Sequence, residues 1–420
     1  MQLNPIELQQ TVVLLQKVNM RRGKASHWGF LGGTVSALVI ASMFLGRITF
    51  GETAKEKAAL LYARVSGVKP NTNSSVLRQM TSLVEQRKLS EAVDLALNSN
   101  DFYNVSLFQY FAPLSNRAEA ADVVLNDMIA MGIANTFVDP STGKDRPYTE
   151  LVKGDFTVKF NNTALDGRNN DLLTTAFNNR TLLTPTSLTI SFPQRPNFPD
   201  AAGVLTSRQF MSEHAIAGTN RRMVHYAFRE FLCTDIKDWR DGDTMISDDY
   251  VTRDVSRAPG GGQSGAIQYQ TECRSCHQVQ DGLRNAFAYH DFSPQNGPIY
   301  DSSKVVAKIN KNIEFAAGFV VQNDNWENRA FRNANNKRFG WRGALAGNGA
   351  KKFGEMIANS DRFKTCAVER VWKHVCNRGL DATEVATRDS LARSFEADNY
   401  SLRGLFKNVA LSPSCLKVGE

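Results

Sequence analysis

The sequence predicts a mainly α fold with long irregular connections. Apolar residues recur at three- and four-residue spacing over residues 54–134 and again from about residue 204 onward, which is the pattern of amphipathic helices. Strand-like runs are short and confined to residues 138–200. The chain has 420 residues, of which 42% are hydrophobic and 22% charged. This composition is ordinary for a folded protein, and the length favours two or three domains.

The first helical region contains three helical patterns. The segment "AKEKAALLYARVSG" ends at Gly67, a residue suited to a C-terminal cap. The segment "SSVLRQMTSLVEQRKLSEAVDLALNSN" offers Ser90 as an N-terminal cap, and "NRAEAADVVLNDMIAMGIA" predicts another amphipathic helix. Residues 138–200 are rich in Asn, Thr, Asp and Pro, so we expect loops with one small hairpin near "DFTVKF" and "TSLTISF".

Helical periodicity returns in the second half of the chain. Its clearest case is "NRRMVHYAFREFLCTDI", which is followed by the Pro/Gly-rich loop "SRAPGGGQSG". The segment "GNGAKKFGEMIANSDRFKTCAVERVWKHVCNRGL" predicts two helices around a break near residues 359–361, and "RDSLARSFEADNYSLRGLFKNVAL" is helical again. We therefore expect a helical N-terminal domain over 55–200 and a second helical domain over 201–420.

The N-terminus contains a candidate membrane segment. Residues 28–46, "WGFLGGTVSALVIASMFLG", carry no charge and as a helix would span about 28 Å. Basic residues in the preceding segment 1–27 place that segment in the cytoplasm, and the remainder of the chain outside. The alternatives are a signal anchor, a signal peptide cleaved after Ala54 (with translation starting at Met20), and a buried soluble helix. The first two deliver the protein to the periplasmic side of a bacterial inner membrane, either anchored or released.

The formal charge of +8 is spread along the chain rather than gathered in one block. This distribution favours a solvated basic surface over a nucleic-acid site. We therefore expect no nucleic-acid partner, and contact with a membrane only through the N-terminal helix.

The sequence "CRSCH" places Cys273, Cys276 and His277 within five residues. This Cys-x-x-Cys-His spacing is the attachment signature of c-type haem. Two thiols three residues apart can each bond one vinyl group of a porphyrin, and the next histidine then ligates the iron. Half of a zinc site and a plain dithiol or disulfide are the alternatives. Predicted export and the lack of a second Cys-x-x-Cys favour one covalent haem c, with Cys273, Cys276 and His277 as its binding residues.

The motif region "CRSCHQVQDGLRNAFAYHDF" resembles the haem segment of planctomycete-type cytochrome c proteins, a family of exported proteins. The likeness extends over most of residues 55–415, through "LLYARVSGVKP", "DFYNVSLFQYFAPLSNR", "VLNDMIAMGIA", "NRRMVHYAFREFLC" and "DRFKTCAVERVWKHVCNRG". One departure is Gly282, which follows Asp281 where the commoner pattern has proline. The resemblance implies haem, export and a cytochrome c-like helical domain with long irregular loops over 201–420, but no particular reaction.

A second axial ligand would come from a methionine or a histidine. Met356 is the single methionine after His277, and it lies in a helical pattern. Met356 is the candidate metal ligand beside His277, with core packing as its alternative role. His290 is a weaker candidate, His374 is expected to be packed or at the surface, and an open sixth position is the remaining possibility. His214 and His225 precede the motif, and we expect structural roles for both.

The remaining cysteines are Cys233, Cys366, Cys376 and Cys415, an even number that suits two disulfides in an oxidising compartment. On one unbroken helix, Cys366 and Cys376 would lie about 15 Å apart, beyond disulfide reach. We therefore expect one of them to bond Cys415 and the other to bond Cys233.

These observations predict an exported, membrane-anchored cytochrome that transfers single electrons to a redox partner through one covalent haem. One alternative is a haem enzyme or gas sensor with an open iron position. The other is a structural or binding protein of the cell envelope.

Overall fold

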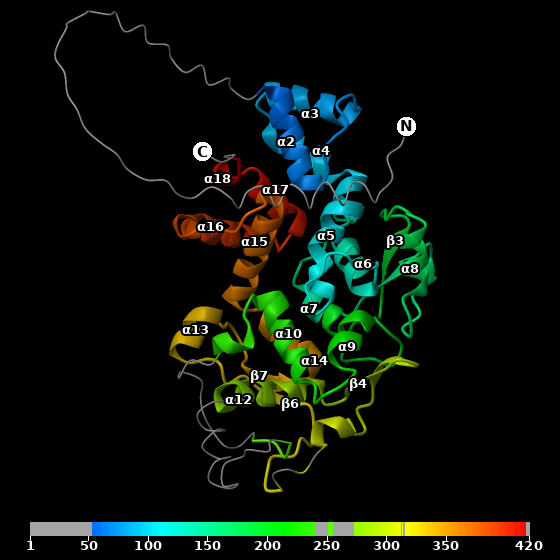
Figure 1. Ribbon diagram of the computed structural model, residues 1–420, viewed down its shortest axis with the longest axis vertical. Helices are drawn as coiled ribbons and strands as arrows, with labels where there is room; N and C mark the ends of the chain where they lie inside the picture. The colour runs from blue at the N-terminus through cyan, green and yellow to red at the C-terminus, as the bar shows by residue number, and fades with distance from the viewer. Residues whose placement is uncertain (1–52, 240–250, 255–272, 312, 314–315, 417–420) are drawn as a thin grey trace, which may run out of the picture. The chain divides into compact units, whose positions relative to one another are not determined.

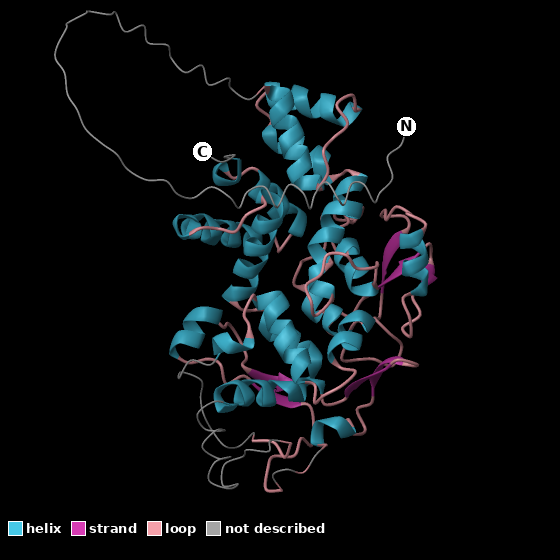
Figure 2. Cartoon of the chain, in the orientation of Figure 1, coloured by secondary structure: helices cyan, strands magenta, loops and turns pink. Residues whose placement is uncertain are grey.

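The computed structural model describes residues 53–239, 251–254, 273–311, 313 and 316–416. This part of the chain is mainly α-helical, as the sequence predicts (Figures 1 and 2). The α-helices are α2 (Ala54–Ser66), α3 (Ser75–Glu85), α4 (Leu89–Leu97), α5 (Leu107–Phe111), α6 (Asp127–Ala134), α7 (Glu150–Lys153), α8 (Asp171–Asn178), α9 (Arg208–His214), α10 (Arg221–Leu232), α12 (Arg274–Leu283), α13 (Asn333–Phe339), α14 (Gly349–Ala358), α15 (Asp361–Cys376), α16 (Val385–Ala397), α17 (Leu402–Ala410) and α18 (Pro413–Leu416).

In the described residues the β-strands form three small antiparallel sheets. The first has the strand order β2-β1-β3, and the other two are the pairs β4-β5 and β6-β7. The strands are β1 (Thr157–Phe160), β2 (Thr163–Ala164), β3 (Leu188–Ser191), β4 (His290–Ser293), β5 (Gly297–Tyr300), β6 (Asn325–Glu327) and β7 (Ala346–Asn348). Two 3₁₀ turns, η5 (Ile236–Trp239) and η7 (Arg284–Phe287), lie on either side of α12 in the chain.

Of the two helix caps predicted from the sequence in this region, the C-cap at Gly67 is confirmed and the N-cap at Ser90 is wrong. Gly67 ends α2 in the left-handed conformation, with φ 77°, and its N–H donates to the Ala63 carbonyl. Ser90 is not the N-cap of α4, because the helix begins at Leu89. The preceding turn contains Arg87 at φ 60° and delivers the chain to Lys88, which takes the cap position.

The segment 116–134 forms a shorter helix than its apolar pattern predicts, since α6 covers only its end. Two asparagines explain the difference. The Asn116 side chain accepts from the N–H of Ala120 and donates to the Ala112 carbonyl, which holds a local loop. The Asn126 side chain caps α6 by accepting from Ile129 N–H. Asparagines that bond the nearby backbone compete with helix formation, so the first half of the segment stays irregular.

The two strand-like runs in residues 138–200 form β1 and β3, which pair in antiparallel register with Val158 opposite Ile190. The tight hairpin lies elsewhere, between β1 and β2. Its two turn residues, Asn161 and Asn162, both have positive φ, which suits the tight turn of a two-residue hairpin. Strand β2 and helix α8 are additions that the sequence analysis does not predict.

Two disulfides are present, as predicted, and of the two pairings that the sequence left open the structure has Cys233 bonded to Cys366 and Cys376 bonded to Cys415. Helix α15 carries Cys366 and Cys376 and begins after Ser360, whose side chain accepts from Phe363 N–H. This cap confirms the break predicted near residues 359–361. The two bridges therefore tie opposite ends of α15 to α10 and α18.

Contacts join described residues on either side of the predicted domain boundary at residue 200. Helix α14 packs on α7, and a Cβ added to Gly354 would lie 1.7 Å from the Val152 carbonyl oxygen. Arg403 on α17 donates to the Leu97 carbonyl at the end of α4. Whether 55–200 and 201–420 are separate functional modules stays a prediction.

Two predicted segments lie outside the described residues. They are the apolar segment 28–46 and the glycine-rich loop before the cysteine motif. Within the described ranges, no helix combines the length and apolar character needed to span a bilayer.

Candidate functional site

The predicted attachment motif lies at the start of α12. Cys273 occupies the N-cap position, and Cys276 and His277 follow in the first helical turn. Residues three and four apart on a helix share one face, so the two thiols and the imidazole project together. All three side chains are half-buried, and neither cysteine is part of a disulfide. The motif therefore presents two thiols and one imidazole on one partly exposed helix face.

The opposite face of α12 is anchored in the core. Val279 and Leu283 are fully buried, and the helix packs against α10, η5, η7 and β6. The thiol of Cys276 lies 3.7 Å from the carbonyl oxygen of Ile236 on η5. Because this apolar face is packed in the core, the core contacts of α12 fix the position of the motif.

One turn beyond the motif, Asp281 lies at the centre of a buried ionic cluster. Its Oδ1 accepts from Nε of Arg221 at 2.5 Å and lies 3.5 Å from Nε of Arg284. Both arginines also face Asp254, at 2.7 Å and 3.9 Å respectively. Asp281 and Arg284 are completely buried. We call Arg221, Asp254, Asp281 and Arg284 the Asp281 cluster.

The charges of the Asp281 cluster compensate one another. Burial alone would raise the pKa of Asp281, but the two guanidinium groups lower it below its usual range. Burial lowers the pKa of Arg284 to about 10, which leaves it charged at neutral pH. Arg221 gains further acceptors from Thr219 and Thr252. Two cations and two anions are thus held out of water as a neutral, hydrogen-bonded group.

The Asp281 cluster orients the motif histidine. Nδ1 of His277 lies 3.4 Å from Oδ2 of Asp281, and both atoms are buried. A carboxylate facing Nδ1 favours the tautomer that carries its proton there. Nε2 then keeps its lone pair, which is the state a metal ligand requires.

Met356 lies on α14 and is 3% exposed. Its Sδ accepts a hydrogen bond of 3.3 Å from the side-chain amide of Asn328, which is itself fully buried. Helices α14 and α12 both pack against α10 and η7, so Met356 and the motif belong to the same part of the core. The assignment of Met356 as a sixth iron ligand stays a prediction.

His290 lies on β4 and is completely buried among aromatic rings, including those of Phe198 and Phe287. Its Nε2 lies 3.4 Å from the carbonyl oxygen of Asp200 and 3.6 Å from that residue's carboxylate. Burial lowers the pKa of His290 to about 3, so the ring is neutral. Its contacts are those of a packed structural histidine.

The remaining histidines considered from the sequence also have local partners. His214 is buried and stacks on Tyr226, with ring centroids 4.0 Å apart. His225 lies 3.7 Å from Asp235. His374 on α15 lies with Nε2 2.9 Å from the Ser106 hydroxyl. In the described ranges, no three His, Cys, Asp or Glu side chains gather as a metal-binding group.

The buried state of His374 predicts an acid-dependent loss of stability. Burial lowers its folded-state pKa to about 4, whereas the unfolded chain titrates near about 6.5. A depressed histidine pKa means that stability is lost as the pH falls from about 6.5 towards 4. From pH 7 to pH 5 the loss is about 2 kcal/mol. Because burial also lowers the pKa of His290, urea titrations at both pH values should show a loss in wild type that exceeds the loss in His374→Gln by about 2 kcal/mol. Equal losses in the two proteins would contradict the prediction.

Comparison with known proteins finds one match. Residues 346–414 match the family described as a protein of unknown function, DUF1585. This segment contains Met356 and the whole of α15, and it lies outside the Cys273–His277 motif. Neither the curated proteins nor the solved structures contain a match to this chain.

The Asp281 cluster is not among the residues predicted from the sequence. Asp281 lies four residues after His277 and three before Arg284, so helical spacing alone places these three side chains together. This spacing could have predicted the contact of Asp281 with His277 and Arg284 from the sequence. Arg221 and Asp254 come from distant positions in the chain. The packing of α10 against α12 brings Arg221 to Asp281, and Asp254 joins the cluster through its ion pair with Arg221.

Proposed function

We propose that this protein is an exported c-type cytochrome that carries one covalent haem and transfers single electrons. The observation that carries the proposal is the arrangement on α12, where Cys273, Cys276 and His277 share one partly exposed face. The buried carboxylate of Asp281 faces Nδ1 of His277 and leaves Nε2 available.

The residues present fit a c-type haem. The two thiols are half-buried and outside any disulfide, so both are available to form thioethers. His277 would supply Nε2 as the axial ligand, and Asp281 lies where its carboxylate can orient the ring through Nδ1. When bound, haem supplies an iron that changes oxidation state by one electron. The protein holds that group covalently and surrounds it with a rigid helix face.

Two further findings support this proposal. DUF1585, which matches residues 346–414, is a family associated with cytochrome c-like proteins. The two disulfides are typical of an exported protein, because such bonds persist in oxidising compartments. The predicted basic segment and apolar segment 28–46 would supply the export route, with the protein on the periplasmic side of the inner membrane, anchored or released. The resemblance to planctomycete-type cytochrome c proteins agrees with this location.

The sixth iron ligand distinguishes the two proposed functions, because an electron carrier has this position filled by the protein and a haem enzyme or gas sensor has it open. We propose Met356 for this position, although its Sδ bonds Asn328 in the structure. A six-coordinate, low-spin iron that does not bind carbon monoxide would support the carrier. High-spin iron that binds carbon monoxide would support the alternative with an open position.

Replacing both motif cysteines with alanine is expected to abolish covalent haem. The measurement is a pyridine haemochrome spectrum of denatured, acid-acetone-washed protein, expressed in cells with a c-type maturation system. Wild type should retain the haem band and Cys273→Ala/Cys276→Ala should lose it. Wild type expressed without the maturation system is the control, because it shows how much haem remains with the protein when no thioether is formed. A wild-type protein without covalent haem would overturn the proposal.

A further inference from the structure

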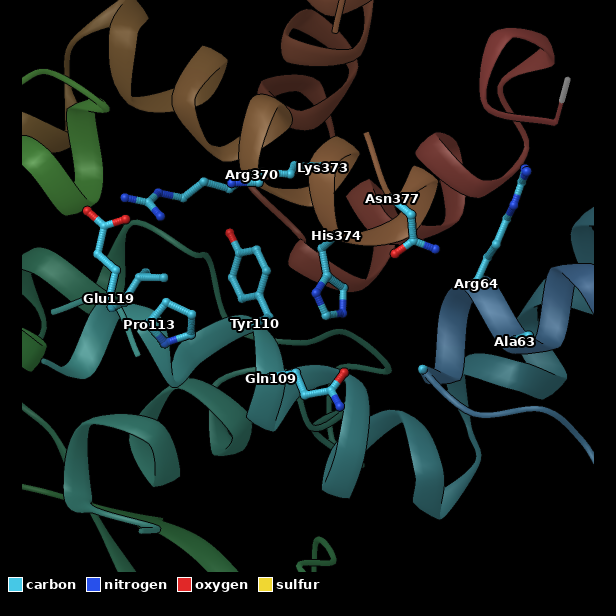
Figure 3. A pocket seen from close by; sticks show the side chains of 12 residues that line it. Ala63, Arg64, Gln109, Tyr110, Pro113, Glu119, Arg370, Lys373, His374 and Asn377 are labelled. Atoms are coloured by element: carbon cyan, nitrogen blue, oxygen red, sulfur yellow. The ribbon is translucent and has the colours of Figure 1, made fainter. Parts of the chain in front are cut away.

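A cavity of about 400 Å³ lies between α2, α5 and the second half of α15 (Figure 3). Small-molecule sites in proteins have volumes from about 300 to 1,000 Å³. None of its lining residues belongs to the Cys273–His277 motif or to the Asp281 cluster. The cavity therefore has the size of a ligand site and lies apart from the proposed haem site.

The charged side chains that line the cavity are mostly cationic. They are Arg64, Arg370 and Lys373, with Glu119 as the single carboxylate among the lining residues. Glu119 lies 3.3 Å from Nε of Arg229, which also pairs with Glu230 at 2.7 Å. The lining therefore carries an excess of positive charge.

Arg370 and Lys373 differ in whether a carboxylate balances their charge. Arg370 lies 2.9 Å from Glu230, a fully buried carboxylate that holds the guanidinium in place. Lys373 is exposed on the cavity side of α15, and among the described residues it has no ion-pair partner. A positioned guanidinium beside an uncompensated ammonium favours an anion in the cavity.

Two uncharged polar side chains, those of Tyr110 and His374, lie beside these cations. Burial keeps His374 uncharged at neutral pH, and its bond to Ser106 orients the ring. Burial also raises the pKa of Tyr110 well above its usual value, so its hydroxyl stays protonated. Figure 3 shows the Tyr110 hydroxyl pointing towards Arg370, with His374 beside it. The Tyr110 hydroxyl also lies 3.5 Å from that of Tyr148, so these neutral groups are held in place beside the cations and add no negative charge to the cavity.

The walls and rim extend the site beyond a bare ion. Pro113 and Leu114 provide apolar surface, and the side-chain amides of Gln109 and Asn377 provide polar groups. A lone inorganic ion would leave most of the volume unfilled. We propose that this cavity binds a small organic oxyanion, whose carboxylate or phosphate lies against Arg370 and Lys373. The proposal does not depend on the haem.

The test is isothermal titration of the full-length protein with three probes, namely citrate, glucose 6-phosphate and uncharged glucose. We expect citrate, glucose 6-phosphate or both to bind at constant ionic strength, and glucose not to bind. Binding by citrate alone would assign a carboxylate ligand, and binding by glucose 6-phosphate alone a phosphate ester. Failure of both anions to bind, or equally strong binding of glucose, would overturn the proposal.

A charge reversal locates the binding. Lys373→Glu is expected to weaken binding of the anion about tenfold or more, because it replaces an attractive charge with a repulsive one. Lys55→Glu is the matched control, since Lys55 is also an exposed helical lysine but does not line the cavity. Circular dichroism and the unfolding temperature should be unchanged in both variants. Equal affinities in wild type and Lys373→Glu would place the anion elsewhere and contradict the inference.

Discussion

Asp281→Asn is expected to lower the free energy of unfolding by about 3–5 kcal/mol, the cost of breaking a buried ion pair. The variant removes the charge that faces Arg221 and Arg284, and Arg284 is completely buried. The second carboxylate near Arg284 belongs to Asp254. It lies 3.9 Å from the Arg284 guanidinium and already pairs with Arg221, so it cannot replace Asp281. The measurement is urea unfolding followed by circular dichroism at pH 7. Asp166→Asn is the control, because Asp166 pairs with Arg168 at the exposed surface, where removal costs about 0–1 kcal/mol.

The same variant separates a structural role of Asp281 from a role towards the haem ligand. A carboxylate that accepts from Nδ1 makes the imidazole a stronger donor, which favours the oxidised iron. In the haem-loaded protein, Asp281→Asn is therefore expected to shift the midpoint potential to more positive values. Asp254→Asn also removes a charge from the cluster, and the ion pairs of Asp254 are with Arg221 and Arg284. An equal potential shift in the two variants would show that charge alone, rather than the contact with His277, sets the potential.

Loss of the Cys233–Cys366 bridge is the second large effect. The bonded residues are 133 apart in sequence, so the bridge restricts the unfolded chain by about 5 kcal/mol in the loop-entropy account. The Cys376–Cys415 bridge spans 39 residues and contributes about 4 kcal/mol in the same account. Alanine pairs avoid leaving a buried hydroxyl at Cys366 or Cys415. Urea unfolding of the two double-alanine variants should rank them in this order, and the reverse order would contradict the loop-length argument.

The disulfide pairing shows how far sequence reasoning reaches when geometry is simple. One continuous helix keeps Cys366 and Cys376 apart, so helical rise alone excludes a bond between them. The choice between the two remaining pairings depends on which end of α15 meets α10 and which meets α18, and this follows from tertiary packing. The structure supplies that choice by joining Cys366 to Cys233.

Helix boundaries show the opposite case. Apolar spacing over 116–134 favours one long helix, but Asn116 bonds its own loop and Asn126 starts a new helix. A periodic pattern records which residues face the core and does not record where polar side chains intercept the backbone. The same limit explains Ser90, a good capping residue that lies just inside α4.

In the candidate site, some residues can be predicted from local spacing and others only from tertiary packing. Cys273, Cys276 and His277 are recognised from spacing alone, because a local motif needs only one helical turn to assemble. The carboxylate that orients His277 follows from the same turn, but the arginine that holds this carboxylate comes from α10, 60 residues earlier. Met356 lies in the core on the helix that the pattern predicts. Its role as a ligand depends on contacts that spacing does not describe.

Intact-mass spectrometry of the protein under denaturing conditions tests the central claim most directly. The protein should be expressed with a c-type maturation system, and then digested so that the peptide containing Cys273–His277 is sequenced. The account predicts a mass that exceeds the polypeptide by one haem, with the added mass on that peptide. A mass equal to the polypeptide alone, or haem carried by another peptide, would contradict the assignment of α12 as the haem-attachment site.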